Sequence, residues 1–125
     1  MSRRETQAQW DYPYGWAPIH LLAVEGMRRY GYDVEANRIS GKFLATVLQN
    51  FLLDHTIREK YDVVTGSEIT HIEAGYRQNV TGFGWTNGVF LELLHQLPPG
   101  LAAQLGAQVY KDGSRLKISP QTPEP

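Results

Sequence analysis

The pattern of apolar and polar positions predicts a first helix soon after the N-terminus. Apolar residues recur there at intervals of three and four, from Ile19 to Tyr30, as they do on the buried face of an amphipathic helix. Pro18 suits the first turn of a helix, and Gly31 suits the position just after its end. The spacing therefore predicts a helix over residues 18–30.

Two further apolar stripes predict two more helices. A broad apolar face predicts a helix over 34–60, with Asp33 as its N-cap. A narrower stripe predicts a helix over 87–97, which the sequence "PPG" at 98–100 ends. The chain is therefore expected to be largely helical.

The other segments have no sustained helical period. Residues 63–84 are expected to form one long loop, and a loop of more than about 15 residues in a compact domain is usually functional or disordered. The stretch "VYKDGSRLKI" at 109–118 has an Asp-Gly pair between short alternating runs, which favours a β-hairpin. The last residues, "SPQTPEP", are expected to be a disordered tail.

All three tryptophans lie in two loops, each directly before a predicted helix. "QWDYPYGWAP" at 9–18 contains Trp10, Asp11 and Trp16, and "GFGWTNG" at 82–88 contains Trp85. Such clusters could plug the core, or they could cover the apolar face of a sugar ring. Antiparallel helical hairpins can bring both loops to the same end, which favours the walls of a pocket. For Trp16, pocket wall and core anchor both stay open.

Composition and charge exclude several classes of function. The 125 residues suffice for one modest domain, and the net charge of −1 gives no electrostatic reason to expect nucleic acid or an anionic membrane as partner. No apolar run approaches the roughly 18 residues of a membrane span, and the N-terminal segment has no apolar core typical of a secretory signal. Cysteine is absent, which excludes disulfides and thiolate chemistry but leaves both cytoplasm and periplasm open.

No metal or other cofactor is expected. The four histidines, which are expected on the surface or in loops, show no metal-ligand spacing among themselves, and His71 with Glu73 supplies too few ligands for a site. "NVT" at 79–81 fits a glycosylation acceptor, which has meaning only in a eukaryotic secretory setting.

Three motifs together resemble the trehalase family. "QWDYPYGWAP" is similar to a trehalase signature, "GFGWTNG" is similar to a second one, and "FLATVLQNFLLDHTIREKYDV" is similar to the family's long helix that ends in Glu-Lys-Tyr-Asp. Their order and spacing make the resemblance specific, and it covers about residues 8–97. It implies an all-α fold, the (α/α)6 toroid of helical hairpins, and the inverting hydrolysis of α,α-trehalose to glucose.

The resemblance also implies that this chain is the C-terminal part of such a toroid. Residues 1–97 would form its C-terminal hairpins, and 98–125 would be an extension. The N-terminal hairpins of the toroid would then be the partners of this chain. The start shortly before Trp10 is expected to reflect a truncated gene or an internal start.

The resemblance assigns the general base to Glu59. Inverting glycosidases use a carboxylic acid at the leaving oxygen and a carboxylate that activates water on the opposite face of the sugar. Taken alone, Glu59 reads as one more charge at the end of a helix, but it aligns with the glutamate of the family's Glu-Lys-Tyr-Asp motif. The family's acid, an aspartate, comes from an earlier hairpin and matches no residue here. The chain alone is therefore expected not to hydrolyse trehalose.

The loop before "GFGW" departs from the family pattern. Trehalases commonly have a glycine run followed by Glu-Tyr, and this chain has "THIEAGYRQNVTGFGW" instead. Glu73 lies further from Gly82 than the family's glutamate, and Tyr76 occupies the equivalent spacing, so either could meet the sugar. The predicted substrate-binding residues are Trp10, Asp11, Trp16, Glu73, Tyr76, Phe83 and Trp85. Two alternatives stay open: a non-catalytic sugar-binding remnant and a related α-glucosidase of the same fold.

Overall fold

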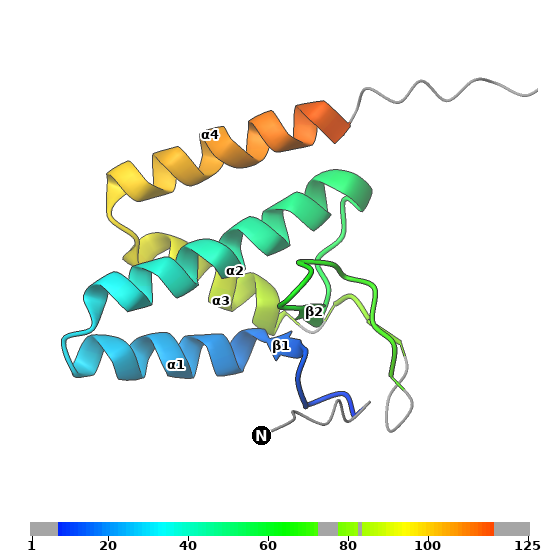
Figure 1. The fold of residues 1–125 in the computed structure, drawn as a ribbon, viewed down its shortest axis with the longest axis horizontal. Helices are drawn as coiled ribbons and strands as arrows, with labels where there is room; N and C mark the ends of the chain where they lie inside the picture. Colours follow the sequence, from blue (N-terminus) through cyan, green and yellow to red (C-terminus); the bar gives the residue numbers. More distant parts are fainter. Residues whose placement is uncertain (1–7, 73–77, 83, 117–125) are drawn as a thin grey trace, which may run out of the picture.

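Four helices and a two-stranded sheet make up the part of the chain that the computed structural model describes, residues 8–72, 78–82 and 84–116. Figure 1 shows their arrangement, with the sheet beside the start of α1. This mostly helical structure is the all-α architecture expected of a portion of the (α/α)6 toroid. The elements are β1 (Tyr14–Trp16), α1 (Ala17–Arg29), α2 (Asp33–Asp54), β2 (Lys60–Asp62), α3 (Trp85–Gln96) and α4 (Pro99–Leu116).

Helix α1 confirms the first predicted helix. Pro18 lies in its first turn, and the chain leaves the helix after Arg29 through Gly31, whose φ of +80° favours glycine. Its buried face, with Val24 at the centre, packs against α2 and α3. The prediction of which face is buried is wrong, because Ile19 and Tyr30, the two ends of the predicted apolar stripe, are exposed.

Helix α2 ends earlier than the apolar pattern predicts. Its first helical residue is Asp33, so the N-cap position belongs to Tyr32 and the prediction of Asp33 as N-cap is wrong. At the other end His55 adopts a left-handed conformation with φ of 60°. The Asp54 carboxylate accepts hydrogen bonds from the Thr56 backbone N–H at 2.9 Å and from its hydroxyl at 2.6 Å. These local bonds compete with the helix ladder, so the predicted helix does not continue to residue 60.

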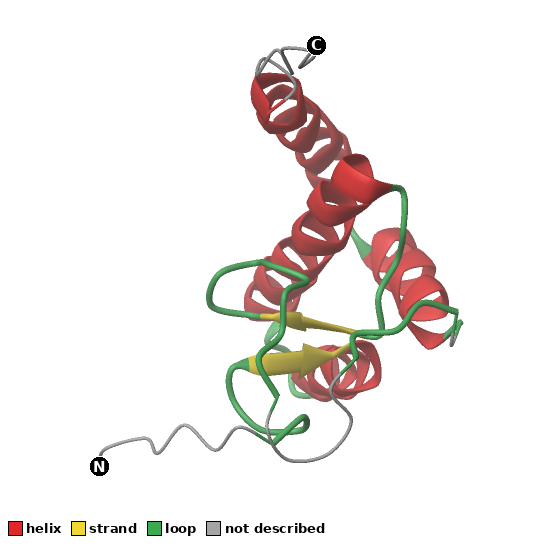
Figure 2. Ribbon diagram, turned by 90° about the vertical axis from the view of Figure 1, so that its right-hand side faces the viewer, coloured by secondary structure: helices red, strands yellow, loops and turns green. Residues whose placement is uncertain are grey.

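A short antiparallel sheet joins the first aromatic loop to the Glu-Lys-Tyr-Asp motif. Trp16 pairs with Lys60 and Tyr14 with Asp62, and Figure 2 shows the two strands side by side. Glycine is required at position 15, at the centre of β1, because other side chains approach its Cα closely. A Cβ there would lie 2.3 Å from Val63 and 2.7 Å from the His20 ring. These strands of three residues were not predicted, because they are too short to show an alternating apolar pattern.

Helix α4 replaces the predicted β-hairpin. The hairpin prediction is wrong over residues 109–116, which are helical. Pro99 begins the helix, as proline does readily, and Leu101, Leu105 and Val109 follow at helical spacing. Packing of α4 against α2, in which Val109 is buried and Leu105 partly buried, outweighs the turn preference of the Asp-Gly pair. The predicted tail, 119–125, lies outside the described residues.

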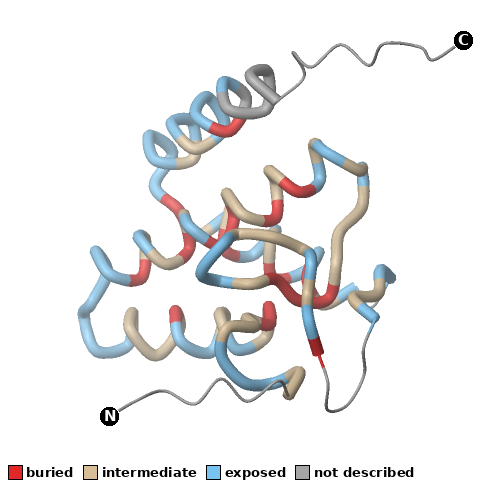
Figure 3. The backbone as a smooth tube through the Cα atoms, turned by 45° about the vertical axis from the view of Figure 1, so that its right-hand side comes forward, coloured by how far each residue is buried: buried red, intermediate tan, exposed pale blue. Residues whose placement is uncertain are grey.

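The core lies where α1, α2 and α3 meet. Its fully buried side chains include Val24, Leu44 and Leu93, one from each helix. Figure 3 shows buried positions recurring along the helices and continuing through the segment that contains β2. Within the described ranges, no helix is both long enough and apolar enough to cross a bilayer.

Candidate active site

The three tryptophans meet in one cluster. The rings of Trp10 and Trp16 are stacked, with centroids 3.8 Å apart and an interplanar angle of 8°. Trp85 meets Trp16 edge-on at 5.8 Å, a favourable aromatic geometry. The two aromatic loops therefore converge, as predicted from the order of the helices. We call Trp10, Trp16 and Trp85 the tryptophan cluster.

The members of this cluster differ in exposure. Trp16 is 4% exposed, and its indole N–H donates to the carbonyl of Gln9 at 2.8 Å. Trp10 is 53% exposed and covers one face of Trp16. Trp16 is therefore a core anchor, and Trp10 carries the aromatic surface that a ligand can reach.

Local structure explains why these rings meet. Trp16 ends β1 and directly precedes α1, and Trp85 is the first residue of α3. Gly84, with φ of +76°, turns the chain into α3. A turn in which the Tyr14 N–H donates to the Asp11 carbonyl at 2.9 Å folds the first loop back toward the sheet.

Glu59 is a buried carboxylate beside this cluster. It is 4% exposed, and its backbone N–H donates to the carbonyl of Val80 at 2.9 Å. Its side chain forms an ion pair with the ammonium of Lys60, which is 0% exposed. The interpretation of Glu59 as a solvated charge at a helix end is therefore wrong. A carboxylate so withdrawn from water is rare unless it is paired, and here it is paired.

Arg58 connects three segments around Glu59. Its guanidinium binds Asp54 and Glu68, both at 2.7 Å, and the Thr86 hydroxyl donates to its carbonyl at 2.8 Å. Hydrogen bonds from Thr56 and then from Arg58 lower the pKa of Asp54 to about 2. Hydrogen bonds to Asp54 and then to Glu68 raise the pKa of Arg58. The sequence reading missed this network, whose only signal was the four-residue spacing of Asp54 and Arg58.

Asn79 and Tyr14 attach the long loop to the sheet. The Asn79 amide donates to the carbonyls of Lys60 at 2.9 Å and Glu68 at 2.6 Å. The Tyr14 hydroxyl donates to the carbonyl of His71 at 2.7 Å and accepts from its N–H at 2.8 Å. The amide nitrogen of "NVT" is thus engaged in packing the loop. Neither residue was singled out as functional from the sequence.

The other predicted site residues divide into two groups. Asp11 lies on the exposed turn before β1, on the same loop as Trp10. Glu73, Tyr76 and Phe83 lie outside the described residues. The structure therefore connects Glu59 to the tryptophan cluster through Lys60, whose ammonium pairs with Glu59 and lies over the Trp16 ring. The roles of Glu73, Tyr76 and Phe83 stay predictions.

His20 differs from the expectation of a surface or loop histidine. It is half-buried in α1, where its Nδ1 lies 3.0 Å from the Trp16 carbonyl and its ring lies against Phe43. Burial lowers its pKa. Across the described parts of the chain, no three His, Asp or Glu side chains gather in a way that could hold a metal ion.

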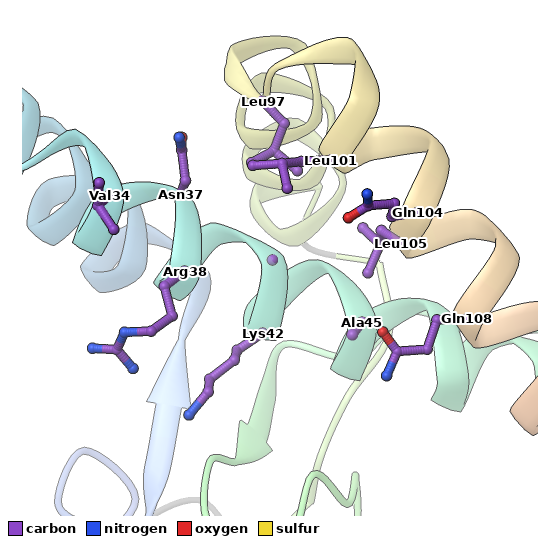
Figure 4. A pocket seen from close by; sticks show the side chains of 11 residues that line it. Val34, Asn37, Arg38, Lys42, Ala45, Leu97, Leu101, Gln104, Leu105 and Gln108 are labelled. Carbon is purple, nitrogen blue, oxygen red and sulfur yellow. The ribbon is translucent and has the colours of Figure 1, made fainter.

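A separate groove of about 560 Å³ lies between α2 and α4 (Figure 4). Its apolar lining comes mainly from Leu97, Leu101 and Leu105, and Arg38 and Lys42 extend from α2 at its edge. None of the described residues that line it has a carboxylate. Size alone would favour this groove as a binding site, but the buried ion pair of Glu59 with Lys60 lies beside the tryptophan cluster instead.

The fold is an all-α segment of helical hairpins, and the site places a buried carboxylate beside clustered tryptophans. This combination is typical of proteins that bind carbohydrate. The trehalase family model matches residues 1–98. The chain belongs to the trehalase family.

Named relatives agree with this assignment. The periplasmic trehalase of Xanthomonas axonopodis pv. citri is 45% identical over 94 residues, which cover 75% of this chain and 16% of that protein. The periplasmic trehalase of Pseudomonas aeruginosa is 42% identical over 97 residues, covering 78% and 17%. The cytosolic neutral trehalase of Saccharomyces cerevisiae is 36% identical over 108 residues, covering 79% and 14%. The chain thus spans only about a sixth of the length of these relatives.

Proposed function

We propose that this chain is the segment of a trehalase that supplies the general base, and that the reaction is hydrolysis of α,α-trehalose with inversion. The observation that carries the proposal is the burial of Glu59 beside the tryptophan cluster. A carboxylate in that setting can take a proton from water in a site from which bulk solvent is excluded.

In the proposed reaction Glu59 accepts a proton from a water molecule on one face of the sugar. The water oxygen attacks the anomeric carbon while the bond from that carbon to the bridging oxygen breaks. A carboxylic acid on the opposite side protonates the bridging oxygen, so the leaving glucose keeps the α configuration and the attacked glucose becomes β. We assign the acid to the hairpins that complete the toroid.

The proposed substrate contacts come from both aromatic loops. Trp10 offers its exposed ring to the apolar face of a glucose unit, with Trp16 and Trp85 behind it. Asp11 is exposed on the same loop as Trp10, and we propose that its carboxylate accepts hydrogen bonds from sugar hydroxyls. Glu73, Tyr76 and Phe83 remain proposed contacts on sequence grounds. Residues 1–97 are the proposed catalytic segment, and 98–125 the proposed extension.

The test is the anomeric composition of the first product. The polypeptide that contains this segment together with the rest of the toroid is given α,α-trehalose, and ¹H NMR records the glucose anomers before they equilibrate. We expect equal amounts of α- and β-glucose. Only α-glucose would contradict inversion. Trehalose binding without turnover would identify a sugar-binding remnant, and faster cleavage of maltose than of trehalose would identify an α-glucosidase.

A further inference from the structure

Lys60 is the largest side chain that the described part of the fold buries completely. Lysine is almost never fully buried without a partner, because its ammonium loses its hydration. Here the ammonium is paired with Glu59, donates to the carbonyl of Gln78 at 3.1 Å and lies 5.0 Å from the centre of the Trp16 ring. The fold therefore surrounds this cation with specific partners.

These contacts place Lys60 between the candidate base and the tryptophan cluster. Trp10 is stacked on one face of Trp16 at a distance that leaves no room for another group, so the ammonium lies over the opposite face. The sheet fixes this arrangement, because Trp16 and Lys60 are paired across β1 and β2. The exposed ring of Trp10 is thus connected to Glu59 through Trp16 and Lys60.

The pairing of Glu59 with Lys60 does not follow from their being neighbours in sequence. In an extended chain successive side chains point to opposite sides, but Glu59 lies in the bend directly before β2, where its carboxylate meets the ammonium of Lys60. The ion pair brings the carboxylate to the side on which Trp16 lies. Without the ammonium, the carboxylate would have other rotamers available.

We propose that Lys60 is a positioning residue, which holds the Glu59 carboxylate in the orientation that meets the attacking water and aligns it with the aromatic surface of Trp10. The proposal rests on the proposed function, since it assigns Lys60 a role in the same site. A base must lie within hydrogen-bond reach of the proton that it takes, and small misplacements in an active site cost large factors in rate.

The kinetic test uses the complete polypeptide with the variants Lys60→Met, Lys60→Arg, Glu59→Gln and the double variant Glu59→Gln/Lys60→Met. We expect Lys60→Met to lower kcat for trehalose by about 10- to 100-fold with KM changed by less than about threefold. Lys60→Arg, which keeps the charge, should recover part of that loss. In the Glu59→Gln background, Lys60→Met should add less than about threefold, because Lys60 acts through Glu59.

Two kinetic results would overturn the proposal. One is kcat within about threefold of the native value in Lys60→Met, and the other is a loss in the double variant equal to the product of the single losses. The double variant also guards against misfolding, since it leaves no buried charge without its partner. If the native polypeptide does not hydrolyse trehalose at all, the proposed function fails. A second experiment then tests the contact between Lys60 and Glu59 without using catalysis.

The second experiment measures reductive methylation of lysines in the 125-residue chain, with mass spectrometry to locate the methyl groups. Lys42, which is exposed, should react rapidly, and Lys60 should be protected in the native chain. Glu59→Gln should release Lys60 to react at least about tenfold faster, since the buried ammonium then loses its carboxylate. Equal reactivity of Lys60 and Lys42 in the native chain would overturn the proposal independently of catalysis.

Discussion

Beside β1 and β2 the chain buries Lys60 completely against Glu59 and Trp16, whereas on α2 it leaves Lys42 exposed at the edge of a groove. The groove is roomy and mainly apolar, and its lining among the described residues includes no carboxylate. The tryptophan cluster offers less open space but holds charges that the fold can bury only with specific partners. The comparison favours a buried, paired charge over the volume of a groove as the criterion for choosing the candidate active site of this fold.

Exchange for methionine should destabilise the chain strongly at Lys60 and hardly at all at Lys42. Lys60→Met leaves the Glu59 carboxylate buried without its partner, so the free energy of unfolding should fall by about 3–5 kcal/mol. Lys42→Met, at an exposed position, should change it by less than about 0.5 kcal/mol. Urea denaturation of the three chains measures both. Equal losses would remove the distinction between the two regions.

Two glycine substitutions should change the free energy of unfolding in opposite directions. Gly15→Ala places a Cβ 2.3 Å from Val63, so overpacking should lower the free energy of unfolding by about 1–3 kcal/mol. Gly41→Ala, inside α2 beside the groove, meets no atom within 4 Å and should raise it by up to about 1 kcal/mol through helix propensity. Thermal unfolding of each variant gives the sign directly, and a stabilising Gly15→Ala would contradict the close approach of β1 to Val63.

Asp54 should make a small contribution to the stability of the chain that disappears in acid. The pKa of Asp54 is about 2 in the folded chain against an ordinary 3.8, because Thr56 and Arg58 donate to its carboxylate. A lowered folded pKa contributes stability above pH 3.8 that is lost as the pH falls toward 2. Asp54→Asn should therefore flatten the fall in Tm between pH 5 and pH 2, and Thr56→Val should flatten it in part. An unchanged slope in Asp54→Asn would show that this carboxylate is not held as described.

The helices were predictable because their apolar stripes are long. The position of α1 was predicted from an apolar stripe between Ile19 and Tyr30, but these two side chains are exposed and the buried face centres on Val24. The positions of α2 and α3 follow from stripes that include Leu44 and Leu93, which pack together in the core. The end of α2 was not predictable from that spacing, because the Asp54–Thr56 bonds compete with an apolar pattern that continues past them. Helix α4 was missed because the Asp-Gly pair suggested a turn and outweighed the stripe of Leu101, Leu105 and Val109.

The site was predictable in part. The convergence of the aromatic loops followed from the order of the helices, and Glu59 was identified by its resemblance to the family motif. The burial of Glu59 and its partnership with Lys60 were not predictable, since they depend on strands of only three residues and on the Asn79 contacts that attach the loop. Long-range packing of short segments leaves little trace in a periodic pattern.

The most direct test of the account is kcat for trehalose in Glu59→Gln, measured in the polypeptide that contains this segment and the rest of the toroid. Glutamine keeps the shape of the side chain and removes the charge that accepts the proton. The exposed Glu35 of α2 supplies the matched control, Glu35→Gln. We predict that Glu59→Gln lowers kcat by about 10²–10⁴-fold with KM nearly unchanged, and that Glu35→Gln has close to native turnover. Turnover near the native value in Glu59→Gln would contradict the assignment of the base to the buried carboxylate beside the tryptophan cluster.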